Sequence, residues 1–242
     1  MVSTTQARKE RERQAREALI LDHAQRLLVR DGFQALNLDQ LAEAVSYSKG
    51  TLYLHFESKE DLTLAVATRA LKERADLFER ASGFQGRTRE RMRAIGFACC
   101  EFAVRHREYF HVEMMLKSTS FWERASEERR RLHGVQASRL FHITNAVVMQ
   151  GIAAGDLPPQ TRAPEVTLSL FSITMGSHIA AMQPDIQLLC GIEDPICVVR
   201  ANQDRVCDGW GWKPLLADWD YAATDRRIRR EVFPEATWLK DL

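Results

Sequence analysis

The stretch from Leu38 to Leu62 constrains the fold most, because it places two short helical patterns on either side of a three-residue break. Apolar residues of the first pattern fall at i, i+3, i+4 and i+7, one face of a short helix: Leu38, Leu41, Ala42 and Val45. After residues 46–48, Leu52 and Phe56 repeat at i and i+4. Three residues cannot reverse the chain into an antiparallel helix pair, so the two helices must cross steeply. This pattern predicts a helix-turn-helix.

Capping residues support these helix boundaries. Asn37 stands just before the first pattern and Asp39 lies in its first turn, so we expect an N-cap and a favourable helix dipole there. Ser58, with Asp61 three residues later, predicts the start of a longer helix that ends near Ala81.

The second short helix carries polar groups on the faces that its apolar residues leave free. A cation, hydroxyl groups, an imidazole and a glycine are the groups that an α-helix brings into a DNA major groove. In this chain they are Ser48, Lys49, Gly50, Thr51, Tyr53 and His55.

The run L-A-x-x-V-S-Y-S-K-G-T-L-Y-x-H-F, followed by S-K-E-D-L, closely resembles the tetracycline-repressor (TetR) family of one-component transcriptional regulators. The resemblance covers residues 15–65 and includes Ala24, Leu27, Leu28, Gly32 and Phe33. It implies that Lys59 contacts a DNA phosphate, where the residue-level alternative is a solvated lysine. The full predicted set of DNA contacts is Asn37, Ser46, Tyr47, Ser48, Lys49, Gly50, Thr51, Tyr53, His55 and Lys59.

The turn departs from the family pattern. The family usually has Gly and Val where this chain has Ser46 and Tyr47. Serine accommodates a positive φ less readily than glycine, so we expect the turn to differ slightly if φ is positive there.

The chain before this motif is charged and then helical. The composition of residues 1–14 predicts a flexible, modestly basic arm. A solvated extension of the following helix is favoured over an arm that becomes ordered only when it binds DNA. A helical apolar pattern over 15–31 ends at Gly32, so we expect residues 15–62 to form a three-helix DNA-binding domain.

Residues 63–242 show helical spacing and no strand alternation, which predicts an all-α protein. The resemblance implies that these residues form a helical ligand-binding and dimerisation domain. Further helices are expected over residues 87–105, 109–116, 120–154, 163–182, 194–208 and 219–232. The aromatic turn at 209–214 should pack on the body or a partner subunit, and the arginines near residue 228 should form a solvated or ion-paired face.

The pattern from Ala163 to Met182 is apolar on most sides, which is typical of a buried helix. We therefore expect subunit association, with Gly176 and Ser177 allowing close helix approach. The resemblance implies a homodimer built on a four-helix interface.

The resemblance also implies a mostly apolar pocket for a small-molecule effector. Each candidate wall residue is individually more typical of plain core, although buried histidines must find polar partners and a ligand is one option. The candidates are Phe97, Phe102, Phe110, Met114, Phe121, Trp122, His142 and His178.

Composition limits the other classes of protein. The net charge of +1 means that any DNA-binding surface must be local. Five cysteines, no signal peptide and no apolar run of membrane length predict a reduced cytoplasmic protein with no membrane partner. The sequence holds no CxxC, HxxxH, HExxH, GxSxG, P-loop or GxGxxG pattern, so we expect no enzyme, no metal site and no cofactor.

These observations predict a sequence-specific transcriptional regulator, in the form of a repressor that a small-molecule effector releases from an inverted-repeat operator. One alternative is a ligand-independent DNA-binding protein whose second half only dimerises or docks a partner. A remote alternative is a thiol or metal sensor.

Overall fold

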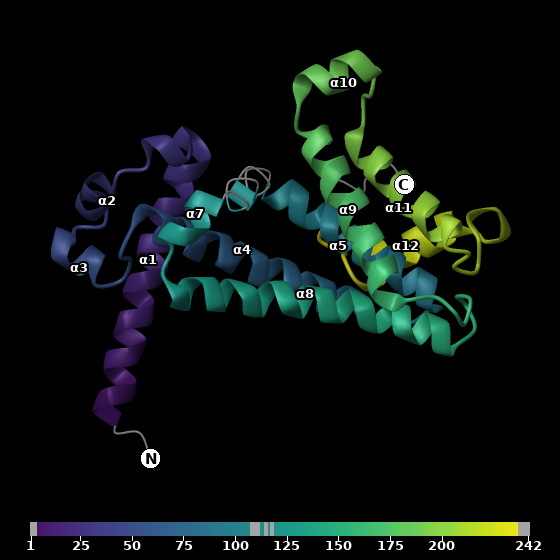
Figure 1. The fold of residues 1–242 in the computed structure, drawn as a ribbon, viewed down its shortest axis with the longest axis horizontal. Coiled ribbons are helices and arrows are strands. Elements are labelled where there is room, and N and C mark those ends of the chain that lie inside the picture. The colour runs from purple at the N-terminus through teal and green to yellow at the C-terminus, as the bar shows by residue number, and fades with distance from the viewer. Residues whose placement is uncertain (1–3, 107–111, 114–115, 117–118, 237–242) are drawn as a thin grey trace. The chain divides into compact units, whose positions relative to one another are not determined.

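The computed structural model describes residues 4–106, 112–113, 116 and 119–236 (Figure 1). Every regular element in this described part is helical, which confirms the predicted all-α class. The chain divides into two compact units, Met1–Ala70 with His111–Val135 and Leu71–Phe110 with Gln136–Leu242. The predicted boundary at residues 62 and 63 therefore differs from the observed division, because a later segment of the chain joins the first unit.

The first unit contains the predicted helix-turn-helix. Its elements are α1 (Thr4–Ala35), α2 (Leu38–Ala44), α3 (Lys49–Tyr53), the first part of α4 (Lys59–Ser82), α7 (Thr119–Arg124) and the first part of α8 (Glu127–Ala153). We call α1, α2 and α3 the reading head. Within it, α2 and α3 lie at one end of the unit beside α1 (Figure 1).

Helix α1 begins at Thr4, so the segment predicted as a flexible arm is a helical extension from that residue onward. Gly32 interrupts the helix with φ of 76° and ψ of 173°, as its predicted role of stop signal requires. Ile20, Ala24 and Leu28 are buried in the core of the unit. The carboxyl half of α1 therefore packs with α2 and α3 in one core, while its amino half remains exposed.

Helix α3 has only five residues, and a helix of that length is not stable by itself in water. Leu52 and Phe56 are fully buried in the core that α1 and α2 complete. Burial of one such side chain contributes about 1.5–3 kcal/mol. Tertiary packing therefore holds α3 in place.

The predicted helix over residues 120–154 is wrong as a single element, because the chain breaks at Ala125 and Ser126 between α7 and α8. The Ser126 amide and hydroxyl donate to Asp61 Oδ1 at 2.9 and 2.7 Å. Ser126 also accepts a bond from the Arg129 amide at 3.4 Å, so it caps α8. A contact with a residue 65 positions earlier thus sets this boundary.

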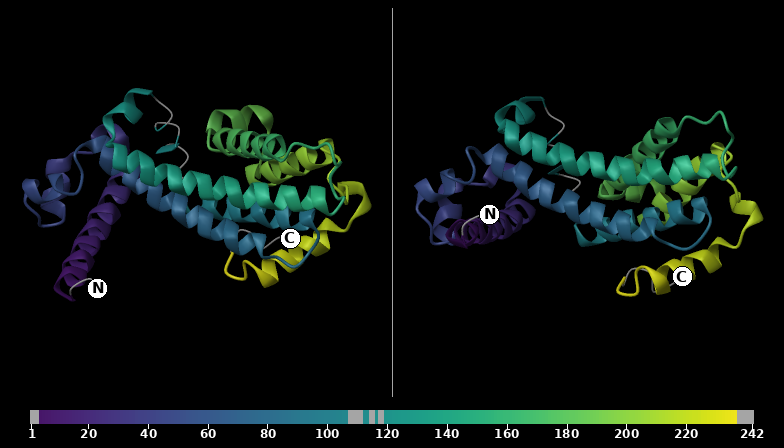
Figure 2. Two further views of the ribbon diagram at one scale, coloured as in Figure 1. Left: turned by 60° about the horizontal axis from the view of Figure 1, so that its bottom comes forward. Right: turned by 90° about the horizontal axis from the view of Figure 1, so that it is seen from below.

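The second unit holds the remaining helices. Its elements are the end of α4, α5 (Thr88–Arg105), most of α8, α9 (Ala163–Ala181), α10 (Pro184–Cys190), α11 (Pro195–Gly209), the 3₁₀ turn η1 (Leu216–Asp218) and α12 (Tyr221–Glu231). Helices α9 and α11 lie side by side (Figure 2). Helix α10 was not predicted, although Pro184 at its start and Gly191 with φ of 62° at its end are typical helix boundaries. The predicted helix over 109–116 falls largely outside the described residues.

A buried charge network joins α5, α11 and α12. Arg93 contacts Asp204 at 2.6 Å and Asp225 at 2.5 Å, and Arg200 also pairs with Asp225. Arg89 contacts Asp208 at 2.5 Å. Because each of these charges has a close partner, the network fixes the carboxyl-terminal helix without leaving an isolated buried ion among them.

The aromatic turn at residues 209–214 packs against its own chain, which is one of the two alternatives that the sequence predicted. Trp212 is fully buried and its Nε1 donates to Thr88 Oγ1 at 3.0 Å.

Within the described residues, no helix combines the length and hydropathy that a membrane crossing requires.

Candidate nucleic-acid interface

The turn between α2 and α3 follows the Schellman pattern of helix termination. The Ser46 amide donates to the Glu43 carbonyl at 3.0 Å, and the Tyr47 amide donates to the Ala42 carbonyl at 2.9 Å. Ser46 takes φ of 58°, the left-handed conformation that favours glycine. The condition stated for this turn, a positive φ at Ser46, is therefore met.

Asn37 acts as the N-cap of α2. Its Oδ1 accepts bonds from the Asp39 amide at 2.8 Å and the Gln40 amide at 3.3 Å. The side chain remains exposed, so capping does not remove it from the predicted DNA contacts.

Ser48 and Thr51 form the amino end of α3. Ser48 Oγ accepts a bond from the Thr51 amide at 3.1 Å and lies 2.8 Å from Thr51 Oγ1. At Gly50 an added Cβ would meet only Ser48 Oγ, at 3.9 Å. Packing within this chain therefore does not require glycine at that position.

Lys49 is held by an acidic residue of α2. Its Nζ lies 2.5 Å from Asp39 Oδ2, and this bond raises the pKa of the lysine. Both side chains are largely exposed. Sequence spacing did not reveal this pair, because its members lie ten residues apart on different helices.

The two tyrosines of the predicted set differ in position. Tyr47 is half-buried and packs against the core of the first unit. Tyr53 is 50% exposed, and the neighbouring Leu54, which was not predicted, is 87% exposed. Tyr53 therefore extends from the open face of α3, whereas Tyr47 mainly supports the turn.

His55 lies off the exposed face on which helical spacing placed it, and its groove contact stays a prediction. Its side chain is only 7% exposed and Nδ1 lies 3.8 Å from Glu17 Oε2 of α1. Burial lowers the pKa of the imidazole. Helical spacing placed His55 beside Tyr53, but the chain leaves the helix after that residue and turns the imidazole inward.

Lys59 is engaged within the protein. Its Nζ donates to the Gln34 carbonyl at 3.0 Å and lies 4.4 Å from the Phe33 ring centroid. Lys59 is the first residue of α4, and its side chain is half-buried against the end of α1. A phosphate contact would therefore use donor capacity of the ammonium beyond the bond to Gln34.

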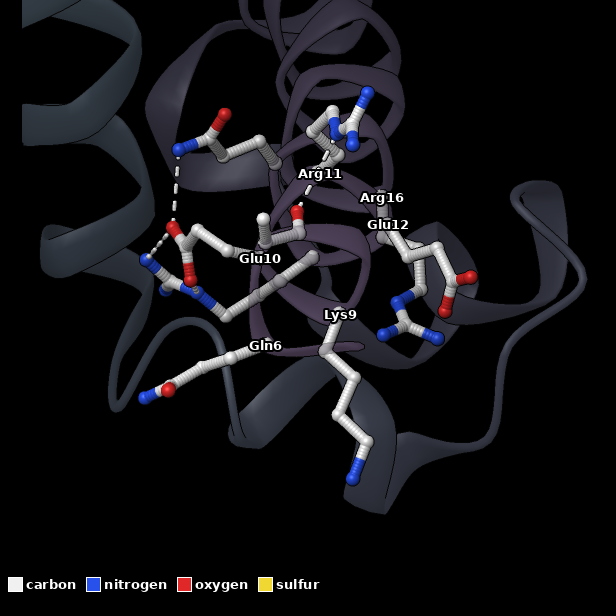
Figure 3. Close-up of a pocket in the computed structure, with 9 residues that line it drawn as sticks. Gln6, Lys9, Glu10, Arg11, Glu12 and Arg16 are labelled. Carbon is white, nitrogen blue, oxygen red and sulfur yellow. Dashed lines mark hydrogen bonds and ion pairs between the residues drawn. The ribbon is translucent and has the colours of Figure 1, made fainter. Parts of the chain in front are cut away.

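A surface hollow lies along the first turns of α1 and is lined by charged and amide side chains (Figure 3). Glu10 accepts bonds from Arg13 and Gln14 at 3.0 Å, while the Arg11 Nε donates to the Ala7 carbonyl. Because one exposed helix provides all of its lining, this hollow is not the apolar effector pocket that the sequence predicted.

The predicted pocket residues come from different parts of the chain. Phe97, Phe102 and His178 are buried in the second unit. Phe121 and Trp122 belong to the first unit, where Phe121 lies 5.4 Å from Phe33 between ring centroids. His142 is exposed, and Phe110 and Met114 lie outside the described residues. The pocket stays a prediction, and its three buried members in the second unit are Phe97, Phe102 and His178.

Thiol chemistry has little support in the described part of the chain. Cys99, Cys100 and Cys207 are buried, and burial raises the pKa of Cys207 to about 12. Exposed Cys197 also has a raised pKa, because its thiol donates to Asp194 at 2.9 Å. The described residues contain no cluster of three or more metal-binding side chains.

One family model matches the part of the chain that contains α2 and α3. Residues 20–66 match the family model described as "Bacterial regulatory proteins, tetR family". No curated protein matches the chain.

Solved structures share the fold over most of the chain. The TetR family transcriptional regulator PfmR from Thermus thermophilus is 23% identical, with a TM-score of 0.60 over 77% of this chain and 96% of that one. The transcriptional regulator FadR from Bacillus subtilis in complex with stearoyl-CoA is 13% identical, with a TM-score of 0.63 over 79% and 98%. A putative transcriptional regulator from Saccharomonospora viridis in complex with choline is 20% identical, with a TM-score of 0.61 over 81% and 96%.

Proposed function

We propose, from the premise that this chain is a regulator with the DNA-binding domain of the TetR family, that it binds an inverted-repeat operator as a homodimer and represses transcription. The observation that carries this proposal is the exposed face of α3. Ser48, Lys49, Gly50 and Tyr53 are exposed there while Leu52 is fully buried. A short helix that is buried on one face and polar on the opposite face suits insertion into a major groove.

Two copies are needed for specificity, because one short helix reads only a few base pairs. Exposed apolar side chains on α9 support such a dimer, since Leu168 is 61% and Phe171 is 44% exposed. Gly176 on the same helix has open space around an added Cβ. Helix α8 contributes exposed Phe141 and Met149. Large apolar side chains left exposed in one copy are typical of an interface.

We assign effector binding to the second unit, around the buried side chains Phe97, Phe102 and His178. Burial and the nearby Arg74 charge lower the pKa of His178 to about 3, so the imidazole is neutral at physiological pH. Its Nε2 lies 3.6 Å from Cys99 Sγ. The surroundings of His178 thus include the Cys99 thiol and the Arg74 guanidinium, whose Nη2 donates to Cys99 Sγ at 3.2 Å, which suits a ligand that combines apolar groups with a hydrogen-bonding group.

The ligand-independent alternative also has an observation in its favour. The predicted pocket residues are divided between the two units and the surface. Thermal unfolding of the full chain with a small-molecule library separates the two functions. A compound that raises the midpoint and weakens DNA binding supports the effector model, and a comprehensive screen without one favours the dimerisation module.

Selection of duplexes from a random library by the purified protein tests DNA reading itself. We expect enrichment of an inverted repeat whose half-site centres lie about one helical turn, roughly 34–36 Å, apart or a multiple of it. A selected pool that binds no better than random duplex would contradict the proposal.

A further inference from the structure

A single guanidinium, that of Arg129 near the start of α8, joins three segments of the first unit. Its Nη1 donates to Glu17 Oε1 of α1 at 2.8 Å, and its Nη2 donates to the His55 carbonyl, just after α3, at 3.0 Å. Its Cζ lies 4.8 Å from the Phe56 ring centroid. The side chain is only 15% exposed, so solvent screens these contacts weakly.

The start of α8 is itself fixed to the start of α4. Asp61 is buried and accepts both bonds that Ser126 donates, while the Ser58 hydroxyl donates to the Arg124 carbonyl at 3.2 Å. The Arg129 Nε lies 3.9 Å from Asp61 Oδ2. The backbone that carries Arg129 therefore has a defined position against the reading head.

The His55 carbonyl is a sensitive point for the orientation of α3. This carbonyl lies two residues beyond Tyr53, where α3 ends, and next to Phe56, whose side chain is buried in the same core as Leu52. A charge-assisted bond at this point therefore adds to the packing of Leu52 and Phe56 in orienting α3. The planar guanidinium reaches Glu17 and His55 at once, which a lysine ammonium at this site would not reproduce.

We propose that Arg129 is a positioning residue for DNA reading: it fixes the orientation of α3 against α1 and makes that orientation depend on α8. Helix α8 continues without interruption to Ala153, so a shift of α8 along or about its axis carries the guanidinium with it. This inference rests on the proposed DNA-reading role of α3. It adds a link to the reading head besides the covalent path through α4.

Hydrogen exchange of the full chain tests this link without DNA. The variants are Arg129→Gln and the milder Arg129→Lys, with Arg131→Gln as the control. Arg131 lies on the same helix, is exposed and pairs with Glu128. In both Arg129 variants we expect the Leu52–Phe56 amides to exchange roughly tenfold faster, the scale for losing a bond to a charged group. The control should exchange like the unchanged protein.

Three results would overturn the proposal: unchanged exchange in Arg129→Gln, equal acceleration throughout α1–α4, or full recovery of slow exchange in Arg129→Lys. The second would indicate general loss of stability, and the third would indicate that charge alone suffices. Binding to the selected duplex gives an independent readout, in which Arg129→Gln should lose sequence preference and Arg131→Gln should keep it. If no duplex is selected, the proposed function fails while the exchange result still decides the role of Arg129.

Discussion

Lys49 Nζ lies 2.5 Å from Asp39 Oδ2, so a cation on the exposed face of α3 is neutralised by an acid of α2 in the free protein. DNA binding through Lys49 must exchange this carboxylate for a phosphate. The pair therefore sets part of the balance between the free and bound states.

Asp39→Asn should strengthen binding to all duplexes, because Lys49 then meets phosphate without first leaving a carboxylate. The slope of log K against log salt should become steeper by about one phosphate contact. Fluorescence anisotropy across a salt series measures both quantities. Glu43→Gln removes the same charge from α2 without breaking the hydrogen bond, and an equal effect in that variant would attribute the change to net charge.

Gly50→Ala should separate folding from binding. The free protein has room for the added methyl group, and alanine is favoured over glycine inside a helix by about 0.5–1 kcal/mol. We therefore expect unchanged or higher stability together with weaker binding to the selected duplex. Gly134→Ala on α8 is the matched control, since an added Cβ there also meets open space. Unaltered affinity in Gly50→Ala would show that DNA does not approach this backbone closely.

Ser46→Gly should stabilise the protein by about 1 kcal/mol or less, because Ser46 has φ of 58° and a left-handed L-residue costs roughly 1–2 kcal/mol, partly offset by the entropy of glycine. Urea unfolding measures the change. Ser46→Val should lower stability instead. If Ser46→Gly were destabilising, the serine side chain would have to contribute more than its backbone conformation costs.

Lys59→Ala and Thr51→Ala should have different effects on specificity. Loss of the ammonium should weaken binding to every duplex by a similar factor, as expected for a phosphate contact. Loss of the threonine hydroxyl should change the preference at one position of each half-site by roughly 1–3 kcal/mol. Competition with single-base variants of the selected duplex measures both, and the opposite pattern would reverse the two roles. The free energy of unfolding of Lys59→Ala must also be measured, because the Lys59 ammonium donates to the Gln34 carbonyl in the free protein.

Stability should fall on acidification below pH 6.5. Burial lowers the pKa of His133 to about 4 and that of His178 to about 3. Between these values and the unfolded pKa near 6.5, the unfolded chain binds more protons, so each histidine destabilises the fold by up to about 1.4 kcal/mol per pH unit. Thermal midpoints at pH 7.5 and pH 5 measure this loss. It should shrink in His133→Gln, and an undiminished loss would assign it to other groups.

Periodicity and capping were sufficient to predict the helix-turn-helix, because the i, i+4 spacing of Leu52 and Phe56 and the capping position of Asn37 can be read from the local sequence. They also predicted the stop at Gly32. The break at Ser126 was not predictable, since it depends on Asp61, and no local pattern indicates a bond across 65 residues.

The candidate site was predicted less completely for the same reason. Helical spacing identifies which residues share a face, but it assumed that the helix extends to His55, whereas α3 ends at Tyr53. Apolar spacing likewise indicates burial without saying which cavity or core a side chain lines. Phe97 and Phe121 were therefore grouped together although they belong to different units.

The contribution of residues 119–135 to the first unit limits how regulators of this kind can be recombined. A fragment that ends at Ala70 would lack Ser126 and Arg129, and the buried Asp61 carboxylate would lose the two hydrogen bonds that it accepts from Ser126. A chimera that takes its DNA specificity from this chain must therefore carry two separate segments. Exchange of specificity between such proteins by a single crossover is correspondingly costly, which favours change by point substitution within α3.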